Sequence, residues 1–128
     1  NMAEIAKIEN VKLLAYSPLG FGMLTGKYIN NPPKNSRLTI WNRFTRYSNK
    51  DSLLATKRYV ELAKKNNITP TQMALAFVNQ QPFVCSNIIG ATNLIQLKEN
   101  IDSININLSK KVIDEINTIH LSQPNPAP

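Results

Sequence analysis

Two stretches decide the fold: Ala15-Tyr-Ser-Pro-Leu-Gly-Phe-Gly-Met-Leu-Thr-Gly-Lys-Tyr28 and Ile88-Ile-Gly-Ala-Thr-Asn-Leu-Ile-Gln-Leu-Lys-Glu-Asn100. Each begins in an apolar run typical of a strand and passes into a loop rich in backbone donors. The second then continues into a helix. Loops and helix N-termini at the carboxyl ends of parallel strands commonly hold anionic ligands. The two stretches therefore predict an anion-binding edge on an α/β protein.

Strand and helix signals alternate around these stretches. The apolar runs at 11–16 and 83–89 predict strands buried on both faces, with Cys85 as a buried, inert thiol. The segment 17–50 holds glycines, Pro32-Pro33 and scattered Asn, and is expected to be a long loop. Capping patterns predict four further helices, which open after Asp51 or Ser52, Thr69, Asn93 and Ser109. In the third of these, one helical face is apolar and carries Leu94, Leu97, Ile101 and Ile104. The last helix is expected to turn its apolar residues inward: Val112, Ile113, Ile116 and Ile119.

Short patterns also predict how the helices begin and end. Thr69 with Gln72, and Asn93 with Gln96, have the spacing of capping boxes. Asn66-Asn67 predicts a left-handed stop at the end of the first of these helices.

This order of elements predicts an α/β fold with parallel strands. Two strands cannot cover their own faces or satisfy their edges. The 128 residues are about half of the ~250 that a (β/α)₈ barrel usually needs. We therefore expect residues 1–121 to be the C-terminal half of such a barrel, incomplete as a closed barrel. Residues 122–128, which hold three prolines, are expected to form an extended tail.

Composition narrows the class of protein. No apolar run approaches the ~20 residues that span a bilayer, and Cys85 is the only cysteine, so a reducing cytoplasm is the expected setting. The net charge of +7 is concentrated in residues 34–65, which carry nine basic and two acidic side chains. Such a region suggests an anionic ligand or partner, although a solvated loop and helix face explains any single residue equally well. Nucleic acid is a less favoured partner, because aromatic residues for base stacking are sparse.

The motifs resemble those of the aldo-keto reductases, NADP(H)-dependent (β/α)₈ enzymes that interconvert carbonyls and alcohols. Ala15-Tyr16-Ser17-Pro18-Leu19-Gly20 with Leu24-Thr25-Gly26-Lys27-Tyr28 is similar to the family's seventh strand and its loop. Ile89-Gly90-Ala91-Thr92 with Gln96-Leu97-Lys98-Glu99-Asn100-Ile101 is similar to the eighth strand and the helix after it. Arg43-Phe44-Thr45-Arg46-Tyr47-Ser48 and the closing Pro126-Ala127-Pro128 resemble one bacterial branch of that family.

The resemblance implies cofactor-binding roles for several residues of the two motifs and for Arg37. Ser17, Leu19, Gly20 and Gly22 would wrap the cofactor pyrophosphate, and Tyr16 would stack on the nicotinamide. Lys27 would place positive charge at the phosphates, and Arg37 would reach the adenosine side. Thr92 and Gln96 would contact the 2′-phosphate region, while Glu99 and Asn100 would read the adenine edge. These side chains suit those tasks: small residues permit close approach, Lys supplies a point charge, and carboxylates and amides recognise a base.

Plainer explanations stand beside these roles. The glycines could serve only as turn residues, and Tyr16 could belong to the core. Thr92 competes with Asn93 for the helix cap, and Glu99 and Asn100 could simply face solvent on a helix.

The resemblance also implies what this chain lacks. The family's catalytic tetrad is an Asp, a Tyr general acid, a Lys and a His, all from earlier strands and loops. The 128 residues are therefore expected to bind part of the cofactor and to be inactive by themselves, since hydride transfer needs an acid at the carbonyl oxygen. The expected partner is the missing N-terminal half of the barrel, or a second copy through self-association. A small carbonyl substrate is expected only in the full-length context. A non-catalytic nucleotide-binding or self-associating module is the alternative, and a nucleic-acid-binding fragment is the third.

Overall fold

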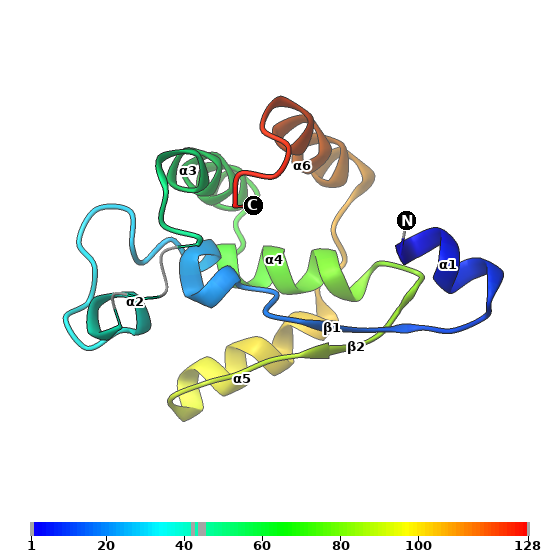
Figure 1. The fold of residues 1–128 in the computed structure, drawn as a ribbon, viewed down its shortest axis with the longest axis horizontal. Helices are drawn as coiled ribbons and strands as arrows, with labels where there is room; N and C mark the ends of the chain where they lie inside the picture. Colours follow the sequence, from blue (N-terminus) through cyan, green and yellow to red (C-terminus); the bar gives the residue numbers. More distant parts are fainter. Residues whose placement is uncertain (1, 42, 44–45, 128) are drawn as a thin grey trace.

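The computed structural model describes residues 2–41, 43 and 46–127 (Figure 1). Phe44, Thr45 and Pro128 of the motifs quoted above lie outside the described residues. The elements follow one another as α1 (Met2–Ile8), β1 (Leu13–Tyr16), the 3₁₀ segment η1 (Gly20–Thr25), α2 (Arg37–Ile40), α3 (Lys50–Lys65), α4 (Pro70–Asn79), β2 (Val84–Ile88), α5 (Leu94–Asp102), the 3₁₀ turn η2 (Ser103–Asn105) and α6 (Lys110–Ser122).

The two strands form a parallel sheet. Leu14 pairs with Ser86, Ala15 with Asn87 and Tyr16 with Ile88, after a register irregularity between Leu13 and Leu14. Because the pairing is parallel, both strands deliver their following loops to the same edge of the sheet. Helices α3 and α4 supply the crossover between the strands, and α4 packs against β2 and α5.

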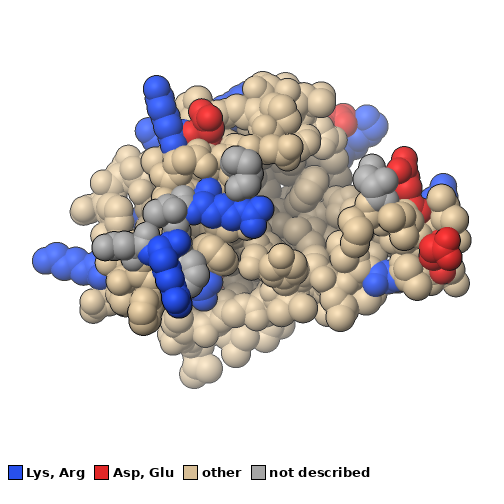
Figure 2. Space-filling view, viewed as in Figure 1, with Lys and Arg blue, Asp and Glu red and all other residues tan. Residues whose placement is uncertain are grey.

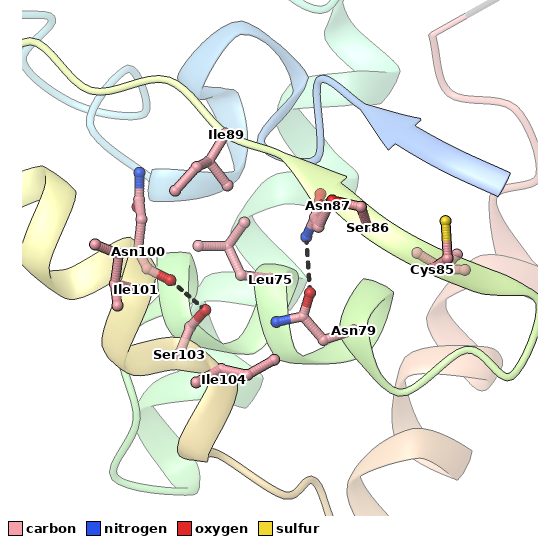
Figure 3. A pocket seen from close by; sticks show the side chains of 11 residues that line it. Leu75, Asn79, Cys85, Ser86, Asn87, Ile89, Asn100, Ile101, Ser103 and Ile104 are labelled. Carbon is pink, nitrogen blue, oxygen red and sulfur yellow. Dashed lines mark hydrogen bonds between the residues drawn. The ribbon is translucent and has the colours of Figure 1, made fainter.

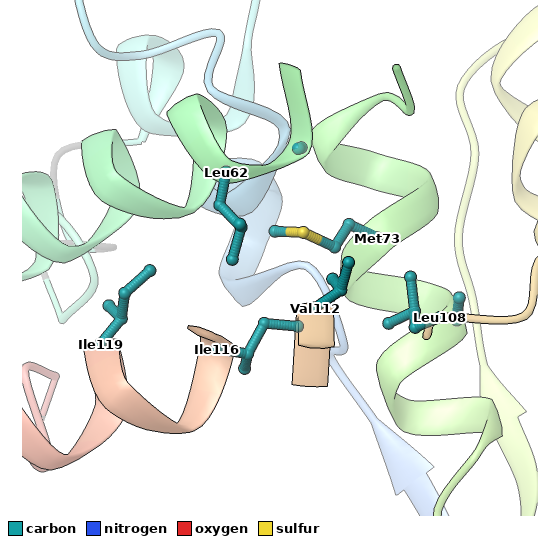
Figure 4. Packing of buried hydrophobic residues seen from close by; sticks show 8 residues of the cluster. Leu62, Met73, Leu108, Val112, Ile116 and Ile119 are labelled. Atoms are coloured by element: carbon teal, nitrogen blue, oxygen red, sulfur yellow. The ribbon is translucent and has the colours of Figure 1, made fainter. Parts of the chain in front are cut away.

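The core lies between α3, α4 and α6 (Figure 4). Met73 of α4 lies between Leu62 of α3 and the apolar face of α6. The buried cluster consists of Leu62, Ala63, Met73, Ala76, Leu108, Val112, Ile116 and Ile119. The periodicity predicted the inward face of α6 correctly: Val112, Ile116 and Ile119 are buried, and Ile113 packs against the cluster from a partly exposed position.

Local capping explains where the helices begin and end. Thr69 Oγ1 accepts from the N–H of Gln72 at 3.1 Å while Gln72 Oε1 accepts from the N–H of Thr69 at 2.9 Å, so the predicted capping box is confirmed. Asn67 has φ 57°, the left-handed stop predicted after α3. The prediction that Asp51 or Ser52 caps α3 is wrong, however. Asn49, not Asp51 or Ser52, accepts from the N–H of Ser52 at 2.9 Å.

The sheet side differs from the sequence expectation. The strands are not buried on both faces: Leu14 is 57% exposed and Ile88 51% exposed. Cys85 is exposed rather than buried. The apolar pattern was identified correctly, but the sheet of the described residues has only two strands, so these side chains stay about half exposed. The expected long loop is also partly structured, because it contains η1 and α2.

The same exposure extends along α5. Its predicted apolar face is present, yet Leu94 is 82% exposed and Ile101 55%. The chain after α6 returns to α3, and the segment 123–127 runs beside that helix (Figure 1). Ser122 closes α6, so the extended segment starts at Gln123.

Candidate cofactor-binding site

The parallel register brings the two motif loops together. Tyr16 is paired with Ile88 at the carboxyl end of the sheet, so the loop starting at Ser17 and the loop starting at Ile89 leave from adjacent positions. Tyr16 is 78% exposed, which contradicts its alternative placement in the core. Its ring is therefore available as a flat surface at this edge.

The first loop is a series of tight turns. Ser17, Gly20 and Gly22 all have positive φ, at 55°, 52° and 91°. The N–H of Gly20 donates to Ser17 O and the N–H of Gly22 donates to Leu19 O, both at 2.9 Å. These two amides are therefore committed to the turns, and the glycines contribute backbone conformation and space rather than hydrogen-bond donors.

Space at Gly22 is occupied by a lysine. A Cβ at Gly22 would lie 3.2 Å from Lys27 Cε and 3.3 Å from Lys27 Nζ. The same ammonium lies 5.1 Å from the centroid of the Tyr28 ring, and Tyr28 itself is buried. The side chain of Lys27 is thus held over the loop with its positive charge beside the turns, and its role at the cofactor phosphates stays a prediction.

Two arginines that are distant in sequence lie near the same loop, Arg37 by direct contact and Arg46 through Tyr47. The guanidinium of Arg37 lies 5.5 Å from the Phe21 ring, and Phe21 meets Tyr47 edge-to-face with centroids 4.9 Å apart. Arg46 lies 5.6 Å from the Tyr47 ring. Such a row of rings and guanidinium groups keeps positive charge close to the turns. Lys and Arg side chains gather on the part of the surface formed by this loop and its surroundings (Figure 2).

Arg37 thus lies close to the first motif, and its expected reach to the adenosine side of the cofactor stays a prediction. Sequence reasoning assigned no role to Phe21, and it quoted Arg46 and Tyr47 only for their resemblance to the bacterial branch. The signal that could have found them is the interleaving of basic and aromatic residues between Trp41 and Tyr47. Arg43 follows this pattern too, 5.4 Å from the Trp41 ring.

The second loop is fixed by its own side chains. Asn93 Oδ1 accepts from the N–H of Gln96 at 2.9 Å, so Asn93 is the cap of α5. Gln96 Oε1 accepts from both the N–H and the hydroxyl of Thr92, each at 3.0 Å. The expected capping box is therefore only half formed, because the Gln96 side chain turns to Thr92 instead of to Asn93. Thr92 and Gln96 form one unit at the start of the helix.

Glu99 and Asn100 are anchored residues rather than simply solvent-facing ones. Asn100 is 6% exposed and its Nδ2 donates to Gly90 O at 3.3 Å. Glu99 Oε1 accepts from the Thr69 hydroxyl at 2.5 Å, which ties α5 to the N-terminus of α4. The four residues predicted in the second motif all lie in α5 or the loop before it: Thr92, Gln96, Glu99 and Asn100.

A pocket of about 280 Å³ lies behind the sheet, between α4, β2, α5 and η2 (Figure 3). Leu75 and Ile104 contribute apolar walls, and Asn87 Nδ2 donates to Asn79 Oδ1 at 3.2 Å. Asn87 Oδ1 is buried and has no hydrogen-bond partner among the described residues. Of the predicted cofactor residues, Asn100 alone lines this pocket. The pocket is therefore separate from the candidate site at the carboxyl end of the sheet.

Comparison with known proteins decides the family. Residues 1–120 match the family model described as "Aldo/keto reductase family". The chain belongs to the aldo/keto reductase family. It is 49% identical over 128 residues to "Protein tas" of Escherichia coli strain K12, which covers 99% of this chain and 37% of that protein. It is 30% identical over 112 residues to the L-glyceraldehyde 3-phosphate reductase of the same organism, which covers 83% of this chain and 32% of that one.

A solved structure agrees with the fold. The glycerol dehydrogenase AKR11B4 from Gluconobacter oxydans superimposes with a TM-score of 0.71 at 24% identity, over 98% of this chain and 38% of that one. This aldo/keto reductase confirms the predicted fold class, a portion of a (β/α)₈ barrel. The chain spans only about 37% of the length of "Protein tas".

In the described part of the chain, no helix is both long and apolar enough to cross a membrane. The same residues bring no three His, Cys, Asp or Glu side chains together as a metal site.

Proposed function

We propose that this chain is the NADP(H)-binding segment of an aldo/keto reductase that interconverts small carbonyl compounds and alcohols. The observation that carries the proposal is the parallel pairing of Tyr16 with Ile88, which puts both motif loops at one edge of the sheet. Lys27 and Arg37 add positive charge to that edge, as the phosphates of NADP(H) require. The cofactor, when bound, supplies or accepts the hydride; the residues of this chain hold and orient it.

The turns are consistent with a close approach of the cofactor. Ser17, Leu19, Gly20 and Gly22 would surround the pyrophosphate. Lys27 already occupies the space beside Gly22, so any larger residue at Gly22 would displace the ammonium. Tyr16 would lie against the nicotinamide with its exposed ring.

The second motif would hold the adenosine end. Thr92 and Gln96, already hydrogen-bonded to each other, would take the 2′-phosphate region. Glu99 and Asn100 would recognise the adenine, with Glu99 exchanging its Thr69 partner for the base. Prior fixation of Thr92 and Gln96 lowers the entropic cost of binding.

Catalysis needs groups beyond these. We propose that the 128 residues by themselves do not turn over substrate, since the tetrad expected from the family has no counterpart among the motif residues. We also propose that the remaining part of the barrel covers the open strand edges and the apolar face of α5. The relatives are longer than this chain, which favours the remaining part of the barrel over a second copy as the covering partner. The cytoplasmic setting stays a prediction.

Binding specificity tests the cofactor assignment. Titration calorimetry should show tighter binding of NADPH than of NADH, because only NADPH carries the 2′-phosphate. Lys27→Met keeps the aliphatic stem and removes the charge, so it should weaken NADPH binding about tenfold. Lys111→Met on α6 is the matched control and should leave binding unchanged. Equal affinity for both cofactors, or equal effects of both variants, would contradict the proposal.

A turnover assay tests the proposal that the 128 residues by themselves are inactive. The purified chain with NADPH and simple aldehydes should show no oxidation of NADPH above background. Light scattering in the same buffer tests how the open edges are covered: a stable dimer would favour self-association over the remaining barrel.

A further inference from the structure

The C-terminal tail is hydrogen-bonded to the start of α3. Pro126 O accepts two hydrogen bonds, from Ser52 Oγ at 2.6 Å and from Asn49 Nδ2 at 2.9 Å. Arg46 Nε donates to Ala127 O at 3.4 Å. More than seventy residues separate the partners in each case. The returning tail lies beside α3 in Figure 1.

This contact has features of a built attachment. Ser52 is only 5% exposed with the tail in place, so the hydrogen bond from its hydroxyl to Pro126 O is shielded from water. Asn49 serves both sides, because its Oδ1 caps α3 while its Nδ2 reaches the tail. Gln123 Nε2 donates to Asp51 O at 3.4 Å, and Pro124 and Pro126 reduce the conformational freedom that docking would cost.

The attached residues continue to the candidate site. Arg46, which donates to the tail, also lies over the Tyr47 ring. Tyr47 packs edge-to-face on Phe21, and its Cδ1 is 3.5 Å from the position of a Cβ at Gly20. Tail, Arg46, Tyr47 and first motif loop therefore form one unbroken series of contacts.

We propose that residues 123–127 form a C-terminal strap that positions Arg46 and Tyr47 against the first motif loop. The strap holds Arg46 beside the Tyr47 ring and keeps that ring against Gly20. Asn49 and Ser52 are positioning residues, since they act through Pro126 O. Only the link from the strap to cofactor affinity rests on the proposed function.

Limited trypsin digestion tests the strap without any cofactor. Trypsin cleaves after Lys and Arg, and native-state cleavage reports local opening. A chain ending at Gln123 keeps the C-cap of α6 and loses the acceptors of Asn49, Ser52 and Arg46. Cleavage after Arg46 should become about tenfold faster, because at least two hydrogen bonds are lost. Cleavage after Lys111 in α6 should keep its wild-type rate.

A point variant guards against a general loss of structure in the truncated chain. Ser52→Ala removes one donor to Pro126 and leaves the Asn49 cap of α3 in place. It should accelerate cleavage after Arg46 about threefold. Ser86→Ala, the same substitution at an exposed position of β2, should not. Unchanged cleavage after Arg46 in both the truncated chain and Ser52→Ala, or equal acceleration at every site, would overturn the strap.

NADPH titration then tests the link to the cofactor. Ser52→Ala should bind NADPH several-fold more weakly than wild type, whereas Ser86→Ala should match wild type. Wild-type affinity in Ser52→Ala would overturn the positioning role. Absence of binding in the wild-type chain would instead contradict the proposed function, and the digestion result would still decide whether the strap exists.

Discussion

The two sides of this molecule have the same apolar character and opposite burial. On the helical side, α3, α4 and α6 bury Leu62, Met73 and Ile116 to 7% exposure or less. On the sheet side, β1, β2 and α5 leave Leu14, Leu94 and Ile101 more than half exposed. Hydrophobic sequence therefore does not by itself mark a core; burial depends on which neighbours the fold supplies.

The candidate site lies between these sides. Its turns are braced by the helical layer, as Gly26 shows by its close approach to Val60 of α3. Its second motif lies largely in α5, whose apolar side chains are exposed. We infer that the helical side determines most of the stability of the chain, while the sheet side determines how well the site is shaped.

The largest difference should appear with matched leucine truncations. Leu62→Ala removes a buried side chain from the core and should lower the free energy of unfolding by about 3 kcal/mol. Leu94→Ala removes an 82% exposed side chain and should change it by less than about 0.5 kcal/mol. Urea denaturation of both variants measures the contrast. Similar losses at the two positions would show that α5 is packed in solution.

Matched glycine substitutions should give the next effect. Gly26 has φ 80° and a Cβ there would lie 2.8 Å from Val60 Cγ2, so Gly26→Ala should cost about 2 kcal/mol. Gly90 has no atom within 4 Å of that position, and Gly90→Ala should stay within about 0.5 kcal/mol. Thermal unfolding followed by circular dichroism checks both. A tolerated Gly26→Ala would mean that the first loop is not held against α3.

Helix capping should give a smaller contrast. Thr69→Ala removes the N-cap of α4 and the hydrogen bond to Glu99, and should cost about 1 kcal/mol. Thr92→Ala removes only a hydroxyl contact to Gln96 beside the Asn93 cap, and about 0.3 kcal/mol is expected. Chemical denaturation resolves the two. A larger loss for Thr92→Ala would indicate that Thr92, not Asn93, caps α5.

The smallest effect concerns pH. Burial raises the pKa of Tyr59 above its usual value of about 10, and the nearby Arg58 partly opposes this. The folded state therefore favours the neutral phenol, and this contribution is fully present below pH 10 and lost as the pH rises through the folded pKa. Relative to Tyr59→Phe, the wild-type free energy of unfolding should fall above pH 10. Parallel curves for the two proteins would contradict the burial of the hydroxyl.

Sequence periodicity and capping predicted much of this structure. The Thr69 box, the Asn67 stop and the inward face of α6 depend on contacts within a few residues, which a sequence pattern records directly. The parallel order of the strands followed from the crossover rule, and the family followed from two motifs in order.

Other features depend on residues far apart in the chain. The exposure of Cys85 and Leu94 follows from uncovered faces, which an apolar run cannot reveal. Placing the α3 cap on Asp51 or Ser52 overlooked Asn49, two residues earlier, as an equally good capping residue. The contacts of Arg37 with Phe21 and of Arg46 with Tyr47 and the tail required the folded chain.

Amide hydrogen exchange of the wild-type chain tests the contrast between the two sides most directly. Amides of α3, α4 and α6 should exchange only on global unfolding, whereas those of β1, β2 and α5 should exchange through local opening at much lower free energy. Uniform protection across both sides would contradict it, because the sheet side would then be covered and as stable as the helical layer.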